Sequence, residues 1–139
     1  MLRRVADMMT GGAVAALPPT ATVDEAARLM KARQCGSVLV TVDNHLKGIF
    51  TERDVVNRVV AERLDAVTTA LAQVMTEKPD TVAPDTLAVD ALRMMEDGGY
   101  RHLPVIRGGK ILGVVSRRDF YGEEKAEIEK ERHFWERIG

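Results

Sequence analysis

Two kinds of hydrophobic periodicity follow one another along this chain, and the same order occurs twice. Small and apolar residues at helical spacing come first, and a run of β-branched residues follows them. The residues at helical spacing are Val23, Ala26, Ala27 and Met30, and then Leu87, Ala91, Leu92, Met94 and Met95. Each β-branched run continues through a polar turn into a shorter strand. The predicted strands and turns are 37–42, Asp43-Asn44 and 48–50, and then 103–106, Gly108-Gly109 and 113–115. A helix opening near Asp54 or Asp119 completes the order βαββα.

The two instances are copies of one unit, displaced by 65 residues. Identical pairs at this offset include Pro19 and Pro84, Ala26 and Ala91, Arg28 and Arg93, Gly48 and Gly113, and Asp54 and Asp119. Met9-Thr10 matches Met75-Thr76 at an offset of 66. A unit of this size exposes one hydrophobic sheet face, so we expect the copies to pack sheet to sheet about a pseudo-twofold axis.

The expected fold class is α/β in the mixed α+β sense, with two βαββα repeats and a C-terminal helix. We expect the first repeat over residues 1–62, the second over 63–121 and the C-terminal helix over 122–139. A connecting helix and linker are predicted over 61–72.

Composition removes several classes of function. The chain has 139 residues, 45% of them hydrophobic and 29% charged, with a net charge of −1. This balance lacks the broad positive field that a nucleic-acid backbone requires, so nucleic acid is not expected as the main partner. No apolar run approaches the ~18 residues of a membrane span, and Asp7 with Gly11-Gly12 interrupts the stretch that could imitate a signal peptide. We therefore expect no membrane partner. Because Cys35 is the single cysteine and no cluster has zinc spacing, we also expect no metal and a cytoplasmic location.

The strand-to-helix junctions carry the candidate chemistry. Residues 48–54 and 113–119 each contain a hydroxyl, one or two arginines and a carboxylate. A hydroxyl, helix N-terminal amides and arginine suit a phosphate, and a carboxylate suits a ribose diol. The spacings Thr51-x-x-Asp54 and Ser116-x-x-Asp119 equally indicate helix caps. The two roles are compatible, and both stay open.

The tandem units, the duplicated junction motif and Leu103-Pro104-Val105 resemble a pair of CBS domains, known as a Bateman module. The resemblance implies a cleft for an adenosine ligand: AMP, ADP, ATP, NAD or S-adenosylmethionine. It places Asp54 and Asp119 on ribose hydroxyls. It places Thr51, Arg53, Ser116, Arg117 and Arg118 near phosphate. Such modules usually regulate enzymes, channels or transporters, and this chain has no room for one, so a stand-alone module is expected.

The repeats differ just before the first strand of each hairpin. Arg101 and His102 stand where the first repeat has Gly36 and Ser37. In related modules, basic residues here reach ligand phosphates, so the resemblance makes Arg101 and His102 phosphate ligands. The alternatives are a solvated surface charge for Arg101 and a partly buried histidine for His102.

Three functions remain open. The leading one is a non-catalytic regulatory module that senses energy or redox state through an adenosine nucleotide and acts on an unknown partner. The others are a structural homodimer with vestigial nucleotide sites and a small nucleotide-handling enzyme, for which no catalytic constellation is recognisable. Cys35 is either a redox-sensing thiol or a small buried hydrophobe.

The C-terminal segment lies outside both repeats and has the composition of a charged helix. Ile128, Trp135 and Ile138 would share one face of it. Because a single helix of this length is marginal in water, we expect it to dock on protein. The partner subunit of a homodimer is one candidate surface, and its own domain is the other.

Overall fold

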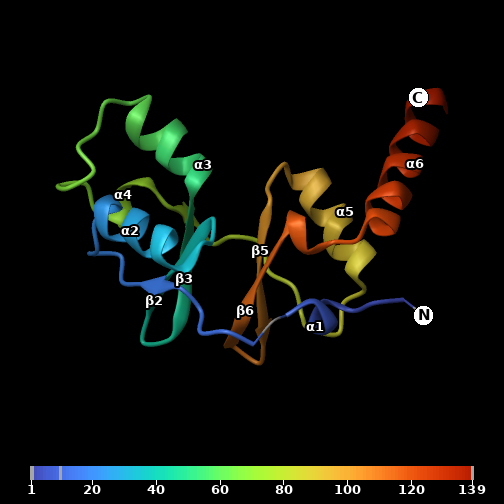
Figure 1. Ribbon diagram of the computed structural model, residues 1–139, viewed down its shortest axis with the longest axis horizontal. Coiled ribbons are helices and arrows are strands. Elements are labelled where there is room, and N and C mark those ends of the chain that lie inside the picture. The colour runs from blue at the N-terminus through green and yellow to red at the C-terminus, as the bar shows by residue number, and fades with distance from the viewer. Residues whose placement is uncertain (1, 10, 139) are drawn as a thin grey trace. The chain divides into compact units, whose positions relative to one another are not determined.

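The structure is a computed structural model that describes residues 2–9 and 11–138. The chain separates into two compact units. The first unit comprises residues 13–79 with 109–111, and the second comprises residues 80–108 and 112–138 together with the N-terminal segment (Figure 1). The mixed α+β class and the C-terminal helix are confirmed. Sheet-to-sheet packing about a pseudo-twofold axis stays a prediction, as do the repeat boundaries.

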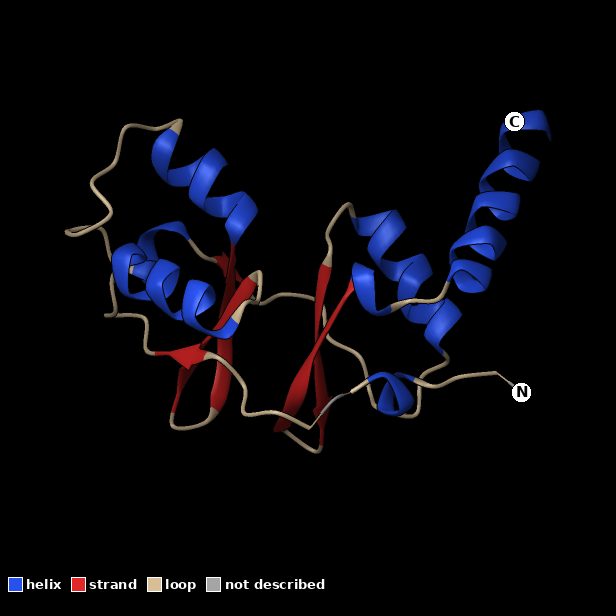
Figure 2. Ribbon diagram, in the orientation of Figure 1, coloured by secondary structure: helices blue, strands red, loops and turns tan. Residues whose placement is uncertain are grey.

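The first unit contains a four-stranded sheet in the order β1-β2-β3-β4 (Figure 2). Its strands are β1 (Ala16–Leu17), β2 (Ser37–Val42), β3 (His45–Thr51) and β4 (Thr76–Glu77). Its helices are α2 (Val23–Arg33), α3 (Glu52–Asp54), the π-helix η1 (Val55–Val60) and α4 (Leu71–Val74). β1 runs parallel to β2, and β3 is antiparallel to both β2 and β4. The predicted strand over 37–42 is confirmed at both ends.

The second unit repeats this plan with a smaller, two-stranded sheet. Its elements are α1 (Val5–Met8), α5 (Ala88–Gly98), β5 (His102–Arg107), β6 (Lys110–Ser116), the 3-10 turn η2 (Arg117–Asp119) and α6 (Gly122–Ile138). The apolar face of α5 packs Ala91, Leu92 and Met95 into a core with Leu103 and Val115. Burial of this stripe explains why the helical periodicity was visible in the sequence.

Both hairpins turn where the sequence predicts. Asp43 and Asn44 have φ values of 51° and 65°, and Gly108 and Gly109 have φ values of 55° and 78°. Two successive residues with positive φ match the right-handed twist of the flanking strands, and Asn, Asp and Gly tolerate this conformation best. The polar turn residues therefore form the two-residue connection of each hairpin, and in the first hairpin the strand register also shifts between Val40 and Thr41.

The segments that open the two repeats are exchanged between the repeats. Val5 N donates to Thr86 O at 2.8 Å, and at the equivalent place Leu71 N donates to Ala21 O at 2.8 Å. Val5 and Leu71 are fully buried. Each opening segment thus packs beside the helix of the other repeat. A compact unit of the structure therefore does not contain the same residues as one repeat of the sequence.

Of the connecting helix and linker predicted over 61–72, the connecting helix is wrong. The helix that begins at Glu52 ends with η1 at Val60, and residues 61–69 form turns before α4. Arg63 has a φ of 58°, which stops a right-handed helix, and the Asp65 carboxylate accepts a bond from Val67 N at 2.8 Å. Local side-chain bonding therefore outcompetes helix propensity here.

In the second repeat, the helix expected near Asp119 is reduced to the single turn η2. Phe120 leaves helical geometry with φ −83° and ψ 145°, and α6 begins only at Gly122. The break turns the Phe120 side chain into the core of the second unit, where it is 4% exposed. The helix is therefore interrupted at Phe120, and the Phe120 side chain is buried in the core instead.

Candidate functional site

The first junction closes on itself through the side chain of Asp54. Asp54 Oδ2 accepts from Thr51 N at 2.9 Å and from Thr51 Oγ1 at 3.1 Å, while Thr51 Oγ1 accepts from Asp54 N at 3.3 Å. This reciprocal pair is a capping box at the start of α3. Glu52 N donates to Gly36 O at 3.0 Å, which ties the junction to the start of β2.

Arg58 is a residue of this junction that the sequence analysis missed. Its Nε lies 3.5 Å from Asp54 Oδ1, one helical turn away. Its Nη1 donates to Val74 O at 3.2 Å and to Met75 O at 2.9 Å. Arg58 therefore links the Asp54 carboxylate to the segment that enters β4. The i,i+4 spacing from Asp54 was the available signal. Arg53, the predicted phosphate contact, is exposed on α3.

The second junction has the same construction. Asp119 Oδ2 accepts from Ser116 N at 2.7 Å and completes a capping box around η2. Arg117 N donates to Arg101 O at 2.9 Å, which is the counterpart of the bond between Glu52 and Gly36. Ser116 Oγ accepts from Arg118 N at 3.4 Å. The capping geometry is thus present at both junctions, and in each it uses only one of the two carboxylate oxygens.

The structure brings all six predicted residues of the second repeat to one end of the β5–β6 hairpin. Arg101 and His102 stand at the start of β5, and the junction follows directly from the end of β6. The six residues are Arg101, His102, Ser116, Arg117, Arg118 and Asp119. Arg101 and Arg118 are exposed, whereas His102 and Arg117 are partly buried. The three predicted residues of the first repeat, Thr51, Arg53 and Asp54, lie together in the other unit.

The two junctions differ in charge. Glu52 in the first repeat is replaced by Arg117 in the second, and Gly36 is replaced by Arg101. The first junction therefore combines Glu52 and Asp54 with Arg53 and Arg58, whereas the second combines Asp119 with Arg101, Arg117 and Arg118. A phosphate would be attracted more strongly to the second junction than to the first.

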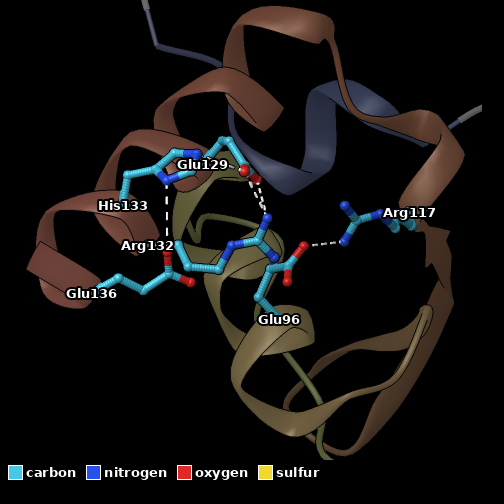
Figure 3. Close-up of polar contacts among 6 residues, drawn as sticks. All are labelled: Glu96, Arg117, Glu129, Arg132, His133 and Glu136. Atoms are coloured by element: carbon cyan, nitrogen blue, oxygen red, sulfur yellow. Dashed lines mark hydrogen bonds and ion pairs between the residues drawn. The ribbon is translucent and has the colours of Figure 1, made fainter.

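Arg117 is held by a partner on α5 that the sequence analysis did not predict. Its Nη1 forms an ion pair with Glu96 Oε1 (Figure 3). The two side chains are 39% and 27% exposed, so solvent still reaches the pair. Glu96 and Arg117 are far apart in sequence, and no local spacing connects them.

Tyr100 anchors the chain immediately before Arg101. Its hydroxyl donates to Asp80 Oδ2 at 2.8 Å. Burial, together with this bond, raises the pKa of Tyr100 to about 12. The tyrosine therefore stays neutral and bonded at physiological pH, which fixes the entry of the chain into β5.

Arg3 joins the N-terminal segment to the second junction. Arg3 Nη2 donates to Asp119 O at 3.2 Å and to Glu124 Oε1 at 2.6 Å. Its guanidinium also lies over the Tyr121 ring, 3.4 Å from the ring centroid. The bond from Arg3 lowers the pKa of Glu124. This cluster holds the start of α6 beside the junction.

Cys35 is half-buried against the core of the first unit, and its Sγ lies 3.5 Å from Ser37 O.

The apolar residues of α6 differ in burial. Ile128 is 7% exposed and belongs to the core of its own unit, whereas Trp135 and Ile138 are 65% and 59% exposed. The predicted apolar face is therefore docked on its own domain at one end and uncovered at the other.

Within residues 2–9 and 11–138, no three of the His, Cys, Asp and Glu side chains gather closely enough to hold a metal ion. The helices described over the same residues are too short or too polar to cross a membrane.

Comparison with known sequences identifies relatives of this chain. CBSCBSPB5, a CBS domain-containing protein of Arabidopsis thaliana, is 40% identical over 100 residues, which are 71% of this chain and 18% of the relative. The chain thus spans less than a fifth of that protein. The CBS domain-containing protein YhcV of Bacillus subtilis is 33% identical over 115 residues, which cover 83% of this chain and 81% of YhcV.

Solved structures show the same fold. The CBS domain protein PAE2072 of Pyrobaculum aerophilum, complexed with AMP, matches with a TM-score of 0.80 and 26% identity, covering 92% of this chain and 99% of that one. A hexameric CBS-CP12 protein from bloom-forming cyanobacteria matches with a TM-score of 0.79 and 26% identity, covering 99% of this chain and 88% of that one. The CBS domain profile matches residues 5–61 and 71–124. Each matched segment contains one hairpin and its strand-to-helix junction, and the chain belongs to the CBS domain family.

Proposed function

We propose that this chain is a non-catalytic regulatory module that binds an adenosine nucleotide at the strand-to-helix junctions of its CBS domains. The observation that carries the proposal is the duplicated junction, with its hydroxyl, carboxylate and arginines, in a chain whose fold matches a protein complexed with AMP. The ligand class is AMP, ADP, ATP, NAD or S-adenosylmethionine, which share adenosine. Binding would change the shape of the module and so act on a separate partner protein.

Asp54 and Asp119 are assigned to ribose hydroxyls in this proposal. A capping box occupies Oδ2 of each carboxylate, and a carboxylate can accept several further bonds. Thr51 and Ser116 present hydroxyls at the same helix starts, where backbone amides favour an anion.

The phosphate is assigned to the second junction. Arg101, His102, Arg117 and Arg118 surround the end of the hairpin there, and guanidinium groups bind phosphate with paired hydrogen bonds. Arg53 would play this part in the first junction, where Glu52 and Asp54 oppose a negative ligand. We therefore expect one phosphate-bearing ligand to bind more tightly than a second.

Self-association and location belong to the same proposal. The uncovered end of α6, with Trp135 and Ile138, and the hexameric assembly of a relative with the same fold support a homo-oligomer, for which we propose a homodimer. The single cysteine supports a location in the reducing cytoplasm.

One observation favours a different function, a structural homodimer with vestigial sites. Both aspartates already have a structural task as capping residues, so the junction motif does not need a ligand to explain it. Release of small molecules from the purified native protein, followed by mass spectrometry, separates the two functions. We expect an adenosine nucleotide, and calorimetric titration with each of the five ligands then ranks them. A protein that releases no nucleotide and takes up none would be structural.

A further inference from the structure

Glu96 on α5 lies between two arginines that belong to different elements. Arg117 of the second junction is its ion-pair partner, and Figure 3 shows the guanidinium of Arg132 on the other side of the same carboxylate, whose negative charge acts on Arg132. α5 and α6 lie beside each other in the second unit (Figure 1). One carboxylate is therefore paired with Arg117 and acts on Arg132 through its charge.

Arg132 is bonded elsewhere in this structure. Its Nη2 donates to both carboxylate oxygens of Glu129 at 2.6 Å. The bond to Glu129 raises the pKa of Arg132, and the negative charge of Glu96 adds to this effect. Glu129 has a second neighbour as well, because its Oε1 lies 3.1 Å from His133 Nε2. Glu129 can therefore lose Arg132 and keep a hydrogen-bonding partner.

A phosphate at Arg117 would disturb this arrangement. Glu96 and the phosphate would compete for one guanidinium, and the two anions repel each other at short range. Arg132 then becomes the cation best placed to neutralise Glu96. The exchange requires little free energy, because the side chains of both ion pairs are 27% to 55% exposed. Ion pairs that solvent reaches in this way are weak.

We propose that Glu96 is a switch residue, which pairs with Arg117 when no phosphate is bound and with Arg132 when a phosphate occupies the second junction. This inference rests on the proposed function and names how that site is regulated. The exchange frees Glu129 on α6 and changes the charge pattern of the helix. Phosphate binding at the second junction thereby changes the ion pairs of α6.

The first repeat lacks this device. Lys31 stands at the position of Glu96, and Glu52 stands at the position of Arg117, so the signs of both charges are reversed. A phosphate at the first junction would meet Glu52 and would not release a carboxylate toward a helix such as α6. The switch therefore belongs to the second junction alone.

Trp135 provides a direct readout. It is the single tryptophan of the chain, it lies one turn after Arg132 on α6, and it is 65% exposed. Its ring contacts Phe134 edge to face with centroids 5.6 Å apart, so a change in the adjacent charges or in the helix alters its surroundings. AMP should change the fluorescence of Trp135 with the same midpoint that calorimetry gives for binding. Saturating adenosine, which lacks the phosphate, should leave the fluorescence unchanged.

Two variants test the exchange from its two ends. Glu96→Gln removes the competitor of the phosphate, so AMP should bind about two- to five-fold more tightly while the fluorescence change is lost. Arg132→Gln removes the second partner of Glu96, so AMP should bind more weakly by about the same factor, again without the fluorescence change. Glu127→Gln and Lys130→Gln remove one charge of each sign from the exposed surface of α6 and should behave as the unaltered chain.

The outcomes separate the switch from the function on which it rests. If calorimetry detects no AMP binding to the unaltered chain, the proposed function fails. If AMP binds and Trp135 does not respond, or if Glu96→Gln keeps both the affinity and the response, the switch is wrong and the binding function stands. Tighter binding by Glu96→Gln, weaker binding by Arg132→Gln and loss of the response in both would support the switch.

Discussion

The backbone oxygen of Thr76 leaves no room for a side chain on Gly48. A Cβ on Gly48 would lie 2.8 Å from Thr76 O and 2.6 Å from Met75 Sδ. At the equivalent position of the second repeat, a Cβ on Gly113 would lie 2.7 Å from Met9 Cε. Each glycine thus contacts a methionine side chain from an exchanged opening segment. Of the two, only Gly48 also lies against a backbone atom, the carbonyl oxygen of Thr76.

Alanine substitutions at the two glycines should therefore differ. Gly48→Ala requires β4 to move and should cost about 1–3 kcal/mol of unfolding free energy. Gly113→Ala needs only the flexible end of Met9 to turn, so its cost should stay below about 1 kcal/mol. Urea unfolding of both variants is the measurement. Met9→Ala should restore the Gly113 variant, whereas Met75→Ala should restore the Gly48 variant only in part, and equal costs at both glycines would contradict this account.

Substitution of the junction aspartates should separate capping from ligand binding. Asp54→Ala and Asp119→Ala each remove a capping box and a proposed ribose contact, so we expect about 1 kcal/mol lower stability and about 1.5–3 kcal/mol weaker AMP binding. Asp119→Glu keeps the capping pattern but displaces the carboxylate by one methylene. It should retain the melting temperature and still lose affinity in calorimetry. Unchanged affinity in the double alanine variant would leave these residues with capping alone.

Arg101 should matter for phosphate and not for adenosine. It is exposed at the start of β5 and joined through its backbone to Arg117 N. Arg101→Ala should weaken AMP binding by about ten-fold and leave adenosine binding nearly unchanged, because a charge-assisted bond to phosphate is lost. Calorimetry with both ligands decides the point. Equal losses for AMP and adenosine would show that Arg101 does not contact phosphate.

The two ends of α6 should have separate roles. Ile128 is buried in the core of the second unit, so Ile128→Ala should cost about 2–4 kcal/mol of unfolding free energy. Trp135→Ala removes an exposed ring and should change stability little, but it should reduce self-association if this end clamps a homodimer. Chemical unfolding measures the first effect, and sedimentation the second.

Truncation gives the complementary measurement. Deleting Glu123–Gly139 also removes the bidentate contact of Arg93 with Glu131, at 2.9 and 2.6 Å, and should destabilise the second unit. Undiminished dimer affinity in Trp135→Ala and in the truncated chain would reject the clamp.

Acid should weaken the contact between the N-terminal segment and α6. The ion pair with Arg3 holds the pKa of Glu124 below its ordinary value, and both side chains are largely buried. Because the folded pKa is the lower one, this stabilisation is present above the unfolded-state pKa of about 4.3 and is lost as the pH falls through the folded value. Urea unfolding from neutral pH down to about pH 3 should show a shallower loss for Glu124→Gln. Glu123→Gln, exposed in the same turn, is the matched control and should keep the slope of the unaltered chain.

Much of the local structure could be predicted from the sequence alone. The strand over 37–42, both hairpin turns and the buried faces of α2 and α5 follow from periodicity and turn chemistry, which act over a few residues. The duplication also located both junctions, because a repeated motif marks equivalent positions whatever their partners are. The charge contrast between the repeats was visible at Arg101 and His102 for the same reason.

The tertiary structure decided which distant groups meet. Met9 packs on Gly113 and Met75 on Gly48, an exchange of opening segments that no local pattern indicates. The ion pair of Arg117 with Glu96 depends on the packing of α5 beside the junction. The break at Phe120 likewise follows from the core, which gains an aromatic ring when the helix is interrupted. Periodicity and turn chemistry depend on the neighbours of a residue along the chain. Burial and charge pairing are properties of the packed units, and they determine the partners of Met9, Glu96 and Phe120.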